Sequence, residues 1–213
     1  MTVYNKGEDL PTPSSSRFSV IPLPNVGREG HTYYHHIVSN YDCCLATHTA
    51  FLQGNPLDPS PDVSKLLVNL QRRTSFHFLS EGILRGTISM DGLLVGCDQN
   101  FELWGGVLND CVLTPMLPLS SVWEKIFGET PEPDREFRYG VGAQFVVSKD
   151  MIRERPKAFY QAIVDLLAYD SHPYEGYVIE RFHAEVFFGV SGPFSCLSPQ
   201  EFGKPTCSPF AGK

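Results

Sequence analysis

The chain has 213 residues, of which 42% are hydrophobic and 12% aromatic, so it can bury a full core. This composition excludes disorder of the whole chain and is typical of one folded domain. The formal net charge of -7 excludes a general attraction to polyanions, so any contact with nucleic acid requires a local basic patch.

The first third of the chain predicts strands and helices in alternation. Residues 1–17 contain prolines and a run of serines, which is typical of a flexible or loosely packed lead-in. The spacing of apolar residues then predicts a strand, a helix, a second strand and a second helix, at 18–21, about 30–41, 47–52 and 62–70. A strand, a helix and a strand in this order indicate an α/β domain.

The rest of the chain predicts short strands and further helices. The strands are expected at residues 93–95, 107–108 and 142–147. The helices are expected at 119–127, from 149 with Ser148 as its cap, after Pro156, and at about 177–188. Prolines and charges predict a loop at 130–136. We therefore expect one α/β domain at 18–190, followed by an irregular tail at 191–213.

No run of residues reaches the roughly 18 apolar positions needed to cross a bilayer, and the polar N-terminus has no hydrophobic signal region. We expect a cytoplasmic protein without membrane contact. The six cysteines are scattered without the spacing of metal ligands, which predicts free thiols. The sequence also lacks the motifs of serine hydrolases, zinc proteases and P-loop nucleotide triphosphatases.

Polar residues are concentrated between the first strand and the first helix, at Asn25-Val26-Gly27-Arg28-Glu29-Gly30. In α/β proteins ligands bind in such a crevice, and free N–H groups at a helix start favour an anion such as phosphate or carboxylate. The alternative is a structural ion pair between Arg28 and Glu29. Both interpretations are open at this point.

Three histidines follow in the same helix. His31 and His35 are four residues apart, which is a spacing of metal ligands, but no carboxylate or cysteine stands at a suitable offset. A solvated or hydrogen-bonded pair is therefore favoured, and we expect no metal. His36 lies nearer the apolar stripe, where it is either a core histidine or a group that transfers protons.

The last predicted helix carries Glu180 and His183, which face the same way at a spacing of three residues. This pair can act as acid and base or bind a cation, or it can be an ordinary pair on a helix surface. Apolar neighbours would shift the pKa of both groups, so Glu180 is the strongest single candidate. Arg153, Arg155 and Lys157 form a basic cluster that is either a solvated face or a polyanion site.

Three blocks of the sequence resemble one family. The first and most specific is Pro24-Asn25-Val26-Gly27-Arg28-Glu29-Gly30-His31-Thr32-Tyr33, continued by His36-Ile37-Val38, Asn40-Tyr41-Asp42 and Thr49-Ala50-Phe51-Leu52-Gln53-Gly54. The second is Gly142-Ala143-Gln144-Phe145-Val146-Val147-Ser148 with Ile152-Arg153-x-Arg155-Pro156-x-x-Phe159-Tyr160, and the third is Gly176-Tyr177-x-x-Glu180-Arg181. Together they resemble the signature of a mostly fungal family catalogued as domain-of-unknown-function family 3431.

The resemblance implies a fold similar to glycosyltransferases of the GT-A type, with a mixed sheet flanked by helices. Such enzymes hold a metal and a diphosphate with an Asp-x-Asp motif after a strand, and Gln53-Gly54-Asn55 stands in its place here. The missing carboxylates argue against metal-dependent sugar transfer. A glycosyltransferase or a sugar-nucleotide-binding protein is therefore the alternative function.

The resemblance also implies an activity, because the fungal family includes arginine-containing cyclodipeptide synthases. These enzymes take amino acids from aminoacyl-tRNA and close an arginine-Xaa diketopiperazine. The expected partners are therefore arginyl-tRNA and a second charged tRNA, and no cofactor is expected. We take this activity as the leading functional hypothesis.

The candidate residues can be assigned to that chemistry. Of Glu29 and Glu180, one would bind the guanidinium of arginine and the other would act as the base. His31, His36 or His183 would share the proton transfer, while Arg28 would meet phosphate or the terminal ribose. The predicted substrate site further includes Asn25, Gly27, Gln53, Gly54, Asn55, Gln144 and Arg181. The predicted tRNA contacts are Arg72, Arg73, Arg153, Arg155 and Lys157.

Overall fold

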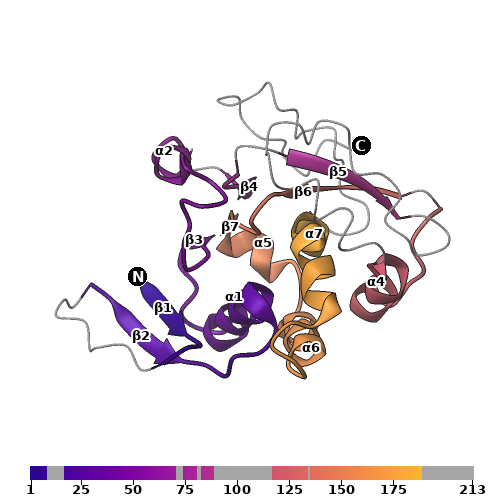
Figure 1. The fold of residues 1–213 in the computed structure, drawn as a ribbon, viewed down its shortest axis with the longest axis horizontal. Coiled ribbons are helices and arrows are strands. Elements are labelled where there is room, and N and C mark those ends of the chain that lie inside the picture. Colours follow the sequence, from indigo (N-terminus) through magenta and orange to yellow (C-terminus); the bar gives the residue numbers. More distant parts are fainter. Residues whose placement is uncertain (9–16, 71–73, 81–82, 89–116, 134, 189–213) are drawn as a thin grey trace.

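Helix α7 (Tyr174–Phe188) lies at the centre of the molecule, with helices on one side and strands on the other (Figure 1). The structure is a computed structural model and describes residues 1–8, 17–70, 74–80, 83–88, 117–133 and 135–188. Val178, Phe182 and Val186 of α7 are fully buried. A helix that is apolar on most sides belongs in a core, which confirms the predicted last helix and extends its start by one turn.

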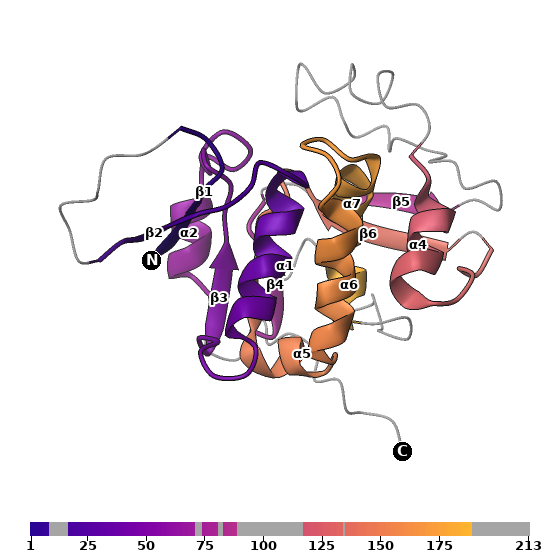
Figure 2. The ribbon, with the colours of Figure 1, turned by 90° about the horizontal axis from the view of Figure 1, so that it is seen from below.

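Two helices pack beside α7, namely α1 (Arg28–Asn40) and α6 (Lys157–Leu167), and Figure 2 shows them side by side. Tyr34 of α1 and Tyr160 of α6 are fully buried, with their ring centroids 6.2 Å apart. Large aromatic rings in such contact contribute much of the apolar burial in a core. Both helices are confirmed close to their predicted positions, because their apolar residues recur with a clear helical period.

The strands of the described residues form three small sheets. The first is antiparallel, with β7 (Phe145–Ser148) between β3 (His48–Phe51) and β4 (Phe76–Phe78). In the second, β5 (Ile83–Ile88) pairs antiparallel with β6 (Arg135–Gly140). In the third, β1 (Thr2–Asn5) pairs parallel with β2 (Ser19–Pro22). Parallel and antiparallel pairs flanked by helices confirm the predicted α/β class.

Three shorter helices complete the described elements: α2 (Val63–Val68), α4 (Leu119–Phe127) and α5 (Lys149–Arg153). The hydroxyl of Ser148 accepts a hydrogen bond from the backbone N–H of Met151 at 3.2 Å, which confirms the predicted cap of α5. Gly128 ends α4 with a φ of 74°, a backbone conformation that favours glycine. None of the helices among the described residues combines the length and apolar character that a membrane crossing requires.

The predicted strand, helix and strand are present in this order as β2, α1 and β3, but the two strands do not share a sheet. Strand β2 pairs with β1 and β3 pairs with β7, so the strands on either side of α1 belong to different sheets. Residues 25–30 therefore do not lie between two strands of one sheet. Three of the four residues of β2 are exposed, so apolar burial does not draw this strand into the central sheet.

Several strands were not indicated by the sequence pattern. Strand β1 lies within the lead-in expected at residues 1–17, and β6 begins inside the loop expected at 130–136. Strand β7 begins at Phe145, because Gly142 and Ala143 have φ angles of 83° and 53° and form a turn instead. The strands expected at 93–95 and 107–108 and the tail at 191–213 lie outside the described residues.

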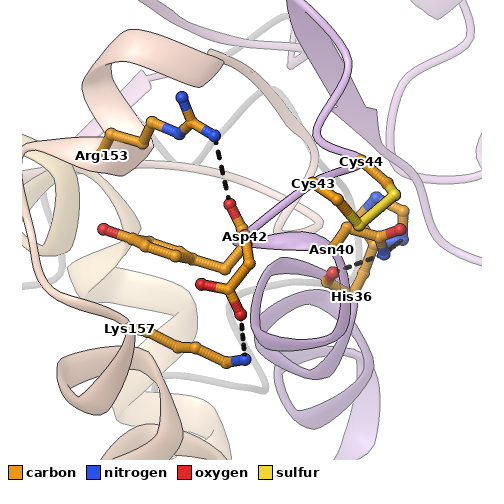
Figure 3. Close-up of a disulfide and its surroundings, with 8 residues drawn as sticks. His36, Asn40, Asp42, Cys43, Cys44, Arg153 and Lys157 are labelled. Carbon is orange, nitrogen blue, oxygen red and sulfur yellow. Dashed lines mark hydrogen bonds and ion pairs between the residues drawn. A yellow bond between two sulfur atoms is a disulfide. The ribbon is translucent and has the colours of Figure 1, made fainter.

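Cys43 and Cys44 are joined by a disulfide in the turn after α1 (Figure 3). This corrects the expectation of free thiols for these two residues, because the turn brings the neighbouring sulfur atoms together. The other four cysteines lie outside the described residues.

Candidate functional site

The first helix begins with an unusual turn. Gly27 and Arg28 both have positive φ angles, of 62° and 50°. A Cβ atom at position 27 would lie 2.5 Å from the Cβ of His31 and 2.8 Å from that of Leu167. Only glycine fits there without strain, so the sequence Gly27-Arg28 fixes the path of the chain into α1.

The loop after α6 supports this turn. The N–H of Gly27 donates to the carbonyl of Asp170 at 2.7 Å, and the N–H of Arg28 donates to that of Ser171 at 3.3 Å. The expected free N–H groups at the helix start are thus already bound at these two positions. An anion would have to displace two protein carbonyls, so the structure does not support an anion site built from these two amides.

Glu29 and Glu180 come together from opposite ends of the sequence, one in the first turn of α1 and the other in α7. The pKa of Glu180 is raised, first by burial and second by the negative charge of Glu29. The charges of Arg181 and Arg28 and a backbone hydrogen bond from Gly142 act in the opposite direction. These two carboxylates thus lie close enough for the charge of Glu29 to affect the pKa of Glu180.

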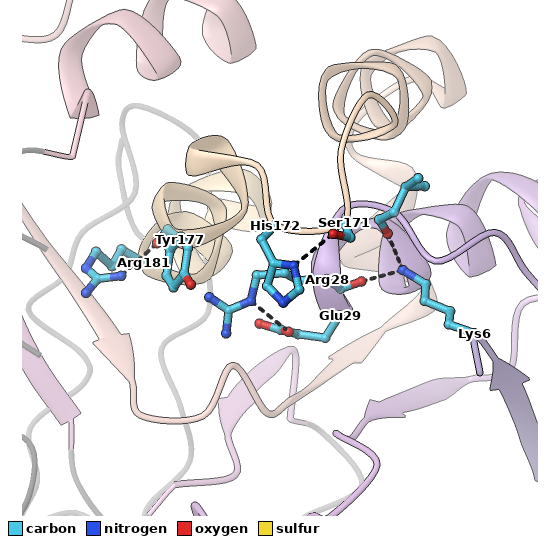
Figure 4. Close-up of polar contacts among 8 residues, drawn as sticks. Lys6, Arg28, Glu29, Ser171, His172, Tyr177 and Arg181 are labelled. Carbon is cyan, nitrogen blue, oxygen red and sulfur yellow. Dashed lines mark hydrogen bonds and ion pairs between the residues drawn. The ribbon is translucent and has the colours of Figure 1, made fainter. Parts of the chain in front are cut away.

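Two arginines lie against aromatic rings beside the carboxylates. The Nε of Arg28 is 3.6 Å from Oε2 of Glu29, and its guanidinium carbon lies 4.0 Å from the centroid of the Tyr177 ring. Figure 4 shows Arg28 between Glu29 and Tyr177. The guanidinium carbon of Arg181 lies 5.2 Å from the centroid of Tyr139. Such contacts hold a guanidinium in a fixed plane.

The Arg28–Glu29 ion pair that the sequence left as an alternative is present, but it is part of this larger cluster. Both side chains are mostly buried, with 23% and 16% of their surfaces exposed. Their interaction is therefore screened less than that of an exposed pair. The pair, Glu180 and the neighbouring Arg181 together form what we call the carboxylate cluster: Arg28, Glu29, Glu180 and Arg181.

Two tyrosine hydroxyls next to this cluster were missed by the sequence reasoning. Tyr33 is buried, and its hydroxyl has no hydrogen-bond partner among the described residues. Burial raises its pKa well above 10, and the charges of Glu29 and Glu180 raise it further. The pKa of Tyr139 is also raised by burial, while Arg181 acts to lower it. Both hydroxyls thus remain protonated and can donate hydrogen bonds.

A signal for Tyr33 does exist in the sequence. It stands four residues after Glu29, so both side chains share one face of α1. The same position also belongs to the apolar stripe that predicts the helix, and the stripe explains Tyr33 without any polar role. No comparable signal exists for Tyr139, because β6 is not predicted.

The histidines have structural partners. His31 is buried and stacks on His35 at 6.1 Å between ring centroids, and burial, then Lys6, then His35 lower its pKa to about 4. The Nδ1 of His36 lies 2.9 Å from the hydroxyl of Tyr4. Among the described residues, no three His, Cys, Asp or Glu side chains are grouped in a way that could hold a metal ion.

His183 lies in the aromatic core. Its Nδ1 is 2.9 Å from the hydroxyl of Tyr34, and burial lowers its pKa to about 3. At neutral pH the ring is therefore uncharged, and Nδ1 shares one hydrogen bond with the tyrosine hydroxyl, whose donor depends on the tautomer of the ring. This geometry favours a core histidine over an acid–base partner of Glu180.

Gln144 holds the segment from Gln53 to Pro56. Its fully buried amide accepts a hydrogen bond from the N–H of Gln53 at 3.2 Å and donates one to the carbonyl of Pro56 at 3.0 Å. Gly54 and Asn55 between them are exposed. The amide oxygen and nitrogen of Gln144 thus already bind backbone, which explains its place in the sequence block without contact to a substrate.

This segment is connected to the carboxylate cluster through Gly142. A Cβ atom at position 142 would lie 2.2 Å from the Cβ of Pro59, so only glycine permits this contact. The backbone of Gly142 in turn donates the hydrogen bond to Glu180. The turn at Gly142 therefore lies between the loop of residues 53–59 and the cluster, whereas Asn25 is exposed just before the turn at Gly27.

The predicted basic cluster lies at the other end of α1 (Figure 3). Arg153 donates to the carbonyl of Tyr41 at 3.4 Å, and the Nζ of Lys157 is 2.7 Å from Oδ2 of Asp42. Arg155 donates to the carbonyl of Val186 and stacks on Phe159. The 13 residues of α1 separate this cluster from Glu29 by about 20 Å. Arg72 and Arg73 lie outside the described residues.

Comparison with known proteins places the chain in one family. A search of curated proteins and a search of solved structures each gave no match. A family model described as "Protein of unknown function (DUF3431)" matches residues 8–202. This span contains the turn at Gly27, the carboxylate cluster and the loop that Gln144 holds. Because the match covers most of the sequence, the chain belongs to this DUF3431 family.

Proposed function

We propose that this protein is an aminoacyl-tRNA-dependent cyclodipeptide synthase that forms an arginine-containing diketopiperazine. The observation that carries the proposal is the convergence of Glu29 and Glu180, from distant parts of the sequence, beside Tyr33 and Tyr139. Two carboxylates that repel each other gain free energy when a cation binds between them. The guanidinium of an arginyl substrate is such a cation, and its planar donors match a carboxylate.

The proposed reaction also requires a base. The ammonium of one amino acid must lose a proton before its nitrogen attacks the ester carbonyl of the other. A C–N bond then forms as the C–O bond to the ribose of the first tRNA breaks. In a second step of the same kind, the remaining amine attacks the remaining ester, which closes the ring and releases the second tRNA. A carboxylate with a raised pKa is a better proton acceptor than an ordinary one. Glu180 has this property because of burial and the charge of Glu29.

The two carboxylates would divide this work. One binds the guanidinium and the other accepts the proton. A protonated hydroxyl such as that of Tyr33, which has no partner among the described residues, supplies a donor for the negative charge that develops on the carbonyl oxygen. The acyl chemistry would thus take place between the first turn of α1 and the second turn of α7.

The test uses the purified full chain with arginyl-tRNA and a mixture of other charged tRNAs, and mass spectrometry of the products. We expect an arginine-containing cyclic dipeptide. Glu180→Gln and Glu29→Gln should each reduce product formation by about 100-fold or more. Glu124→Gln changes an exposed carboxylate on α4 and should leave the rate unchanged.

The kinetic constants separate the two roles. The substitution that lowers kcat identifies the base, and the one that mainly raises KM for the arginyl substrate identifies the guanidinium site. Folded wild-type protein that forms no cyclic dipeptide from any pair of charged tRNAs would overturn the proposal. Thermal stabilisation by a nucleoside diphosphate sugar with manganese would instead support the glycosyltransferase alternative.

A further inference from the structure

The N-terminal segment reaches the carboxylate cluster through Lys6. Strand β1 pairs with β2, and the N–H of Leu23 donates to the carbonyl of Asn5 at 2.8 Å, which continues the contact beyond the two strands. On the other side, the ring of Tyr4 packs edge-on against His35 and His36, each at 5.8 Å between centroids. Residues 2–5 are thus fixed on α1 before the chain reaches Lys6.

The ammonium of Lys6 binds both sides of the unusual turn. Its Nζ donates to the carbonyl of Val26 and to that of Arg28 (Figure 4). These two carbonyls bracket the peptide units of Gly27 and Arg28, the pair with φ angles of 62° and 50°. A positive φ at a residue other than glycine is unfavourable and persists only where the surroundings enforce it. One cation bound to two carbonyls contributes to that enforcement, together with the hydrogen bonds that Gly27 and Arg28 donate to the loop after α6.

The orientation of this turn determines where the functional side chains point. Arg28 and Glu29 are the first two residues of α1. Arg28 places its guanidinium over Tyr177, and the charge of Glu29 raises the pKa of Glu180. If Arg28 returned to a negative φ, both side chains would leave these positions. The charge of Lys6 is also felt by Glu29, His31 and His35 on α1.

We propose that Lys6 is a positioning residue, which holds the turn at Gly27 and Arg28 and thereby orients Arg28 and Glu29 within the carboxylate cluster. Lys6 itself needs no contact with substrate. For its effect on catalysis this inference rests on the proposed function, but its effect on the turn is independent of any activity.

The independent arm observes Arg28 directly. In the wild type, the guanidinium carbon of Arg28 lies 4.0 Å from the centroid of the Tyr177 ring. The Nε–H, one bond away from this carbon, should therefore show a ring-current shift in a nitrogen–proton NMR spectrum of the full chain. In Lys6→Met, which keeps a stem of similar length without the ammonium, we expect this signal to move to the position of a free arginine side chain. Lys6→Arg keeps a positive charge and several donors and should restore most of the shift.

The kinetic arm compares the same variants in the cyclodipeptide assay. Lys6→Met should lower kcat/KM by roughly tenfold, consistent with a loss of orientation, while its melting temperature stays within the range of the control. The control is Lys65→Met, which removes an exposed lysine on α2 that pairs with Asp62. Lys6→Arg should recover most of the activity, which a general loss of stability would not predict.

The outcomes are distinct. An unchanged Arg28 signal in folded Lys6→Met overturns the inference, as does a shifted signal with full activity in an enzyme that forms product. If the wild type forms no product, the proposed function fails, but the NMR arm still decides whether Lys6 orients Arg28. If Lys6→Met fails to fold, Lys6→Gln, which retains a neutral donor, takes its place and should show an intermediate shift.

Discussion

The imidazole of His183 is packed among aromatic rings, with centroid distances of 4.7 Å to Phe145, 5.8 Å to Tyr34 and 6.0 Å to Tyr33. Its Nδ1 shares a hydrogen bond with the hydroxyl of Tyr34, while Nε2 has no partner among the described residues. A buried polar atom that loses its partner costs more than the bond itself contributed. The pair should therefore behave as a unit in stability measurements.

This predicts the result of a double substitution. Tyr34→Phe alone should lower the free energy of unfolding by about 1–3 kcal/mol, because it leaves Nδ1 unsatisfied in the core. Adding His183→Leu removes the unsatisfied group and should recover part of the loss. Urea denaturation measures both values, and Tyr174→Phe, at a tyrosine with 70% of its surface exposed, serves as the control. Additive losses in the double variant would contradict this account.

At the same scale, the sequence identifies some residues of the carboxylate cluster and not others. Glu29 stands in a dense polar run and Glu180 in an otherwise apolar helix, and each is conspicuous in its surroundings. The tyrosines are not conspicuous, since an aromatic residue in an apolar stripe is adequately explained by burial. Lys6 could not be found either, because its two partners are backbone carbonyls that carry no sequence signal.

At the scale of elements, the loop of residues 53–56 depends on one side chain that stands just before another strand, β7. The amide of Gln144 precedes β7 and binds the N–H of Gln53 and the carbonyl of Pro56, next to the end of β3. Both backbone groups would lose their partner if the amide were removed. The polar ends of Gln53 and Asn55 would then lose their fixed position relative to Gly142.

Gln144→Leu should therefore lower the free energy of unfolding by about 2 kcal/mol, because it leaves two backbone groups without partners. It should also increase the rate of proteolytic cleavage within residues 53–59, since local opening of the loop becomes easier. Limited proteolysis with mass spectrometry measures this rate. Gln161→Leu removes an exposed glutamine on α6 as the control. Equal cleavage rates in the two variants would show that other contacts hold the loop.

The elements that could be predicted share one property, which is a strong local period. Helices α1, α4 and α6 and strands β2 and β3 appear in the sequence because their apolar residues repeat along the element itself. Strand β6, with the sequence Arg-Glu-Phe-Arg-Tyr-Gly, has charges between its apolar residues and follows prolines. It is stabilised by pairing with β5 and by packing on α7, which are long-range contacts that no local pattern contains.

At the scale of the whole molecule, buried ionisable groups act on stability with opposite signs. The pKa of His31 and that of His183 are lowered to about 4 and about 3. These two rings therefore lower the free energy of unfolding as the pH falls below 6.5, because the unfolded chain then binds protons that the folded rings do not. The pKa of Glu185 is raised from 4.5 to about 7, mainly by burial and against the effect of Arg135. The free energy of unfolding therefore falls as the pH rises from 4.5 to 7, because the unfolded chain releases the proton of Glu185 more readily than the folded protein does.

The Glu185 contribution can be isolated by comparing Glu185→Gln with the wild type across this range. The carboxylate is fully buried, and Arg135 lies 3.1 Å from its Oε2. In the native state it stays protonated up to about pH 7, whereas in the unfolded chain it ionises near 4.5. Relative to the glutamine variant, the wild type should therefore lose roughly 3 kcal/mol of stability between pH 4.5 and 7, at about 1.4 kcal/mol per pKa unit.

Urea denaturation at several pH values measures the difference, in which the histidine contributions cancel because both proteins contain them. The free energy of unfolding of Glu124→Gln, a substitution on the exposed face of α4, should change with pH in the same way as that of the wild type. A difference between Glu185→Gln and the wild type that does not change with pH would mean that Arg135 keeps the carboxylate ionised in the folded protein.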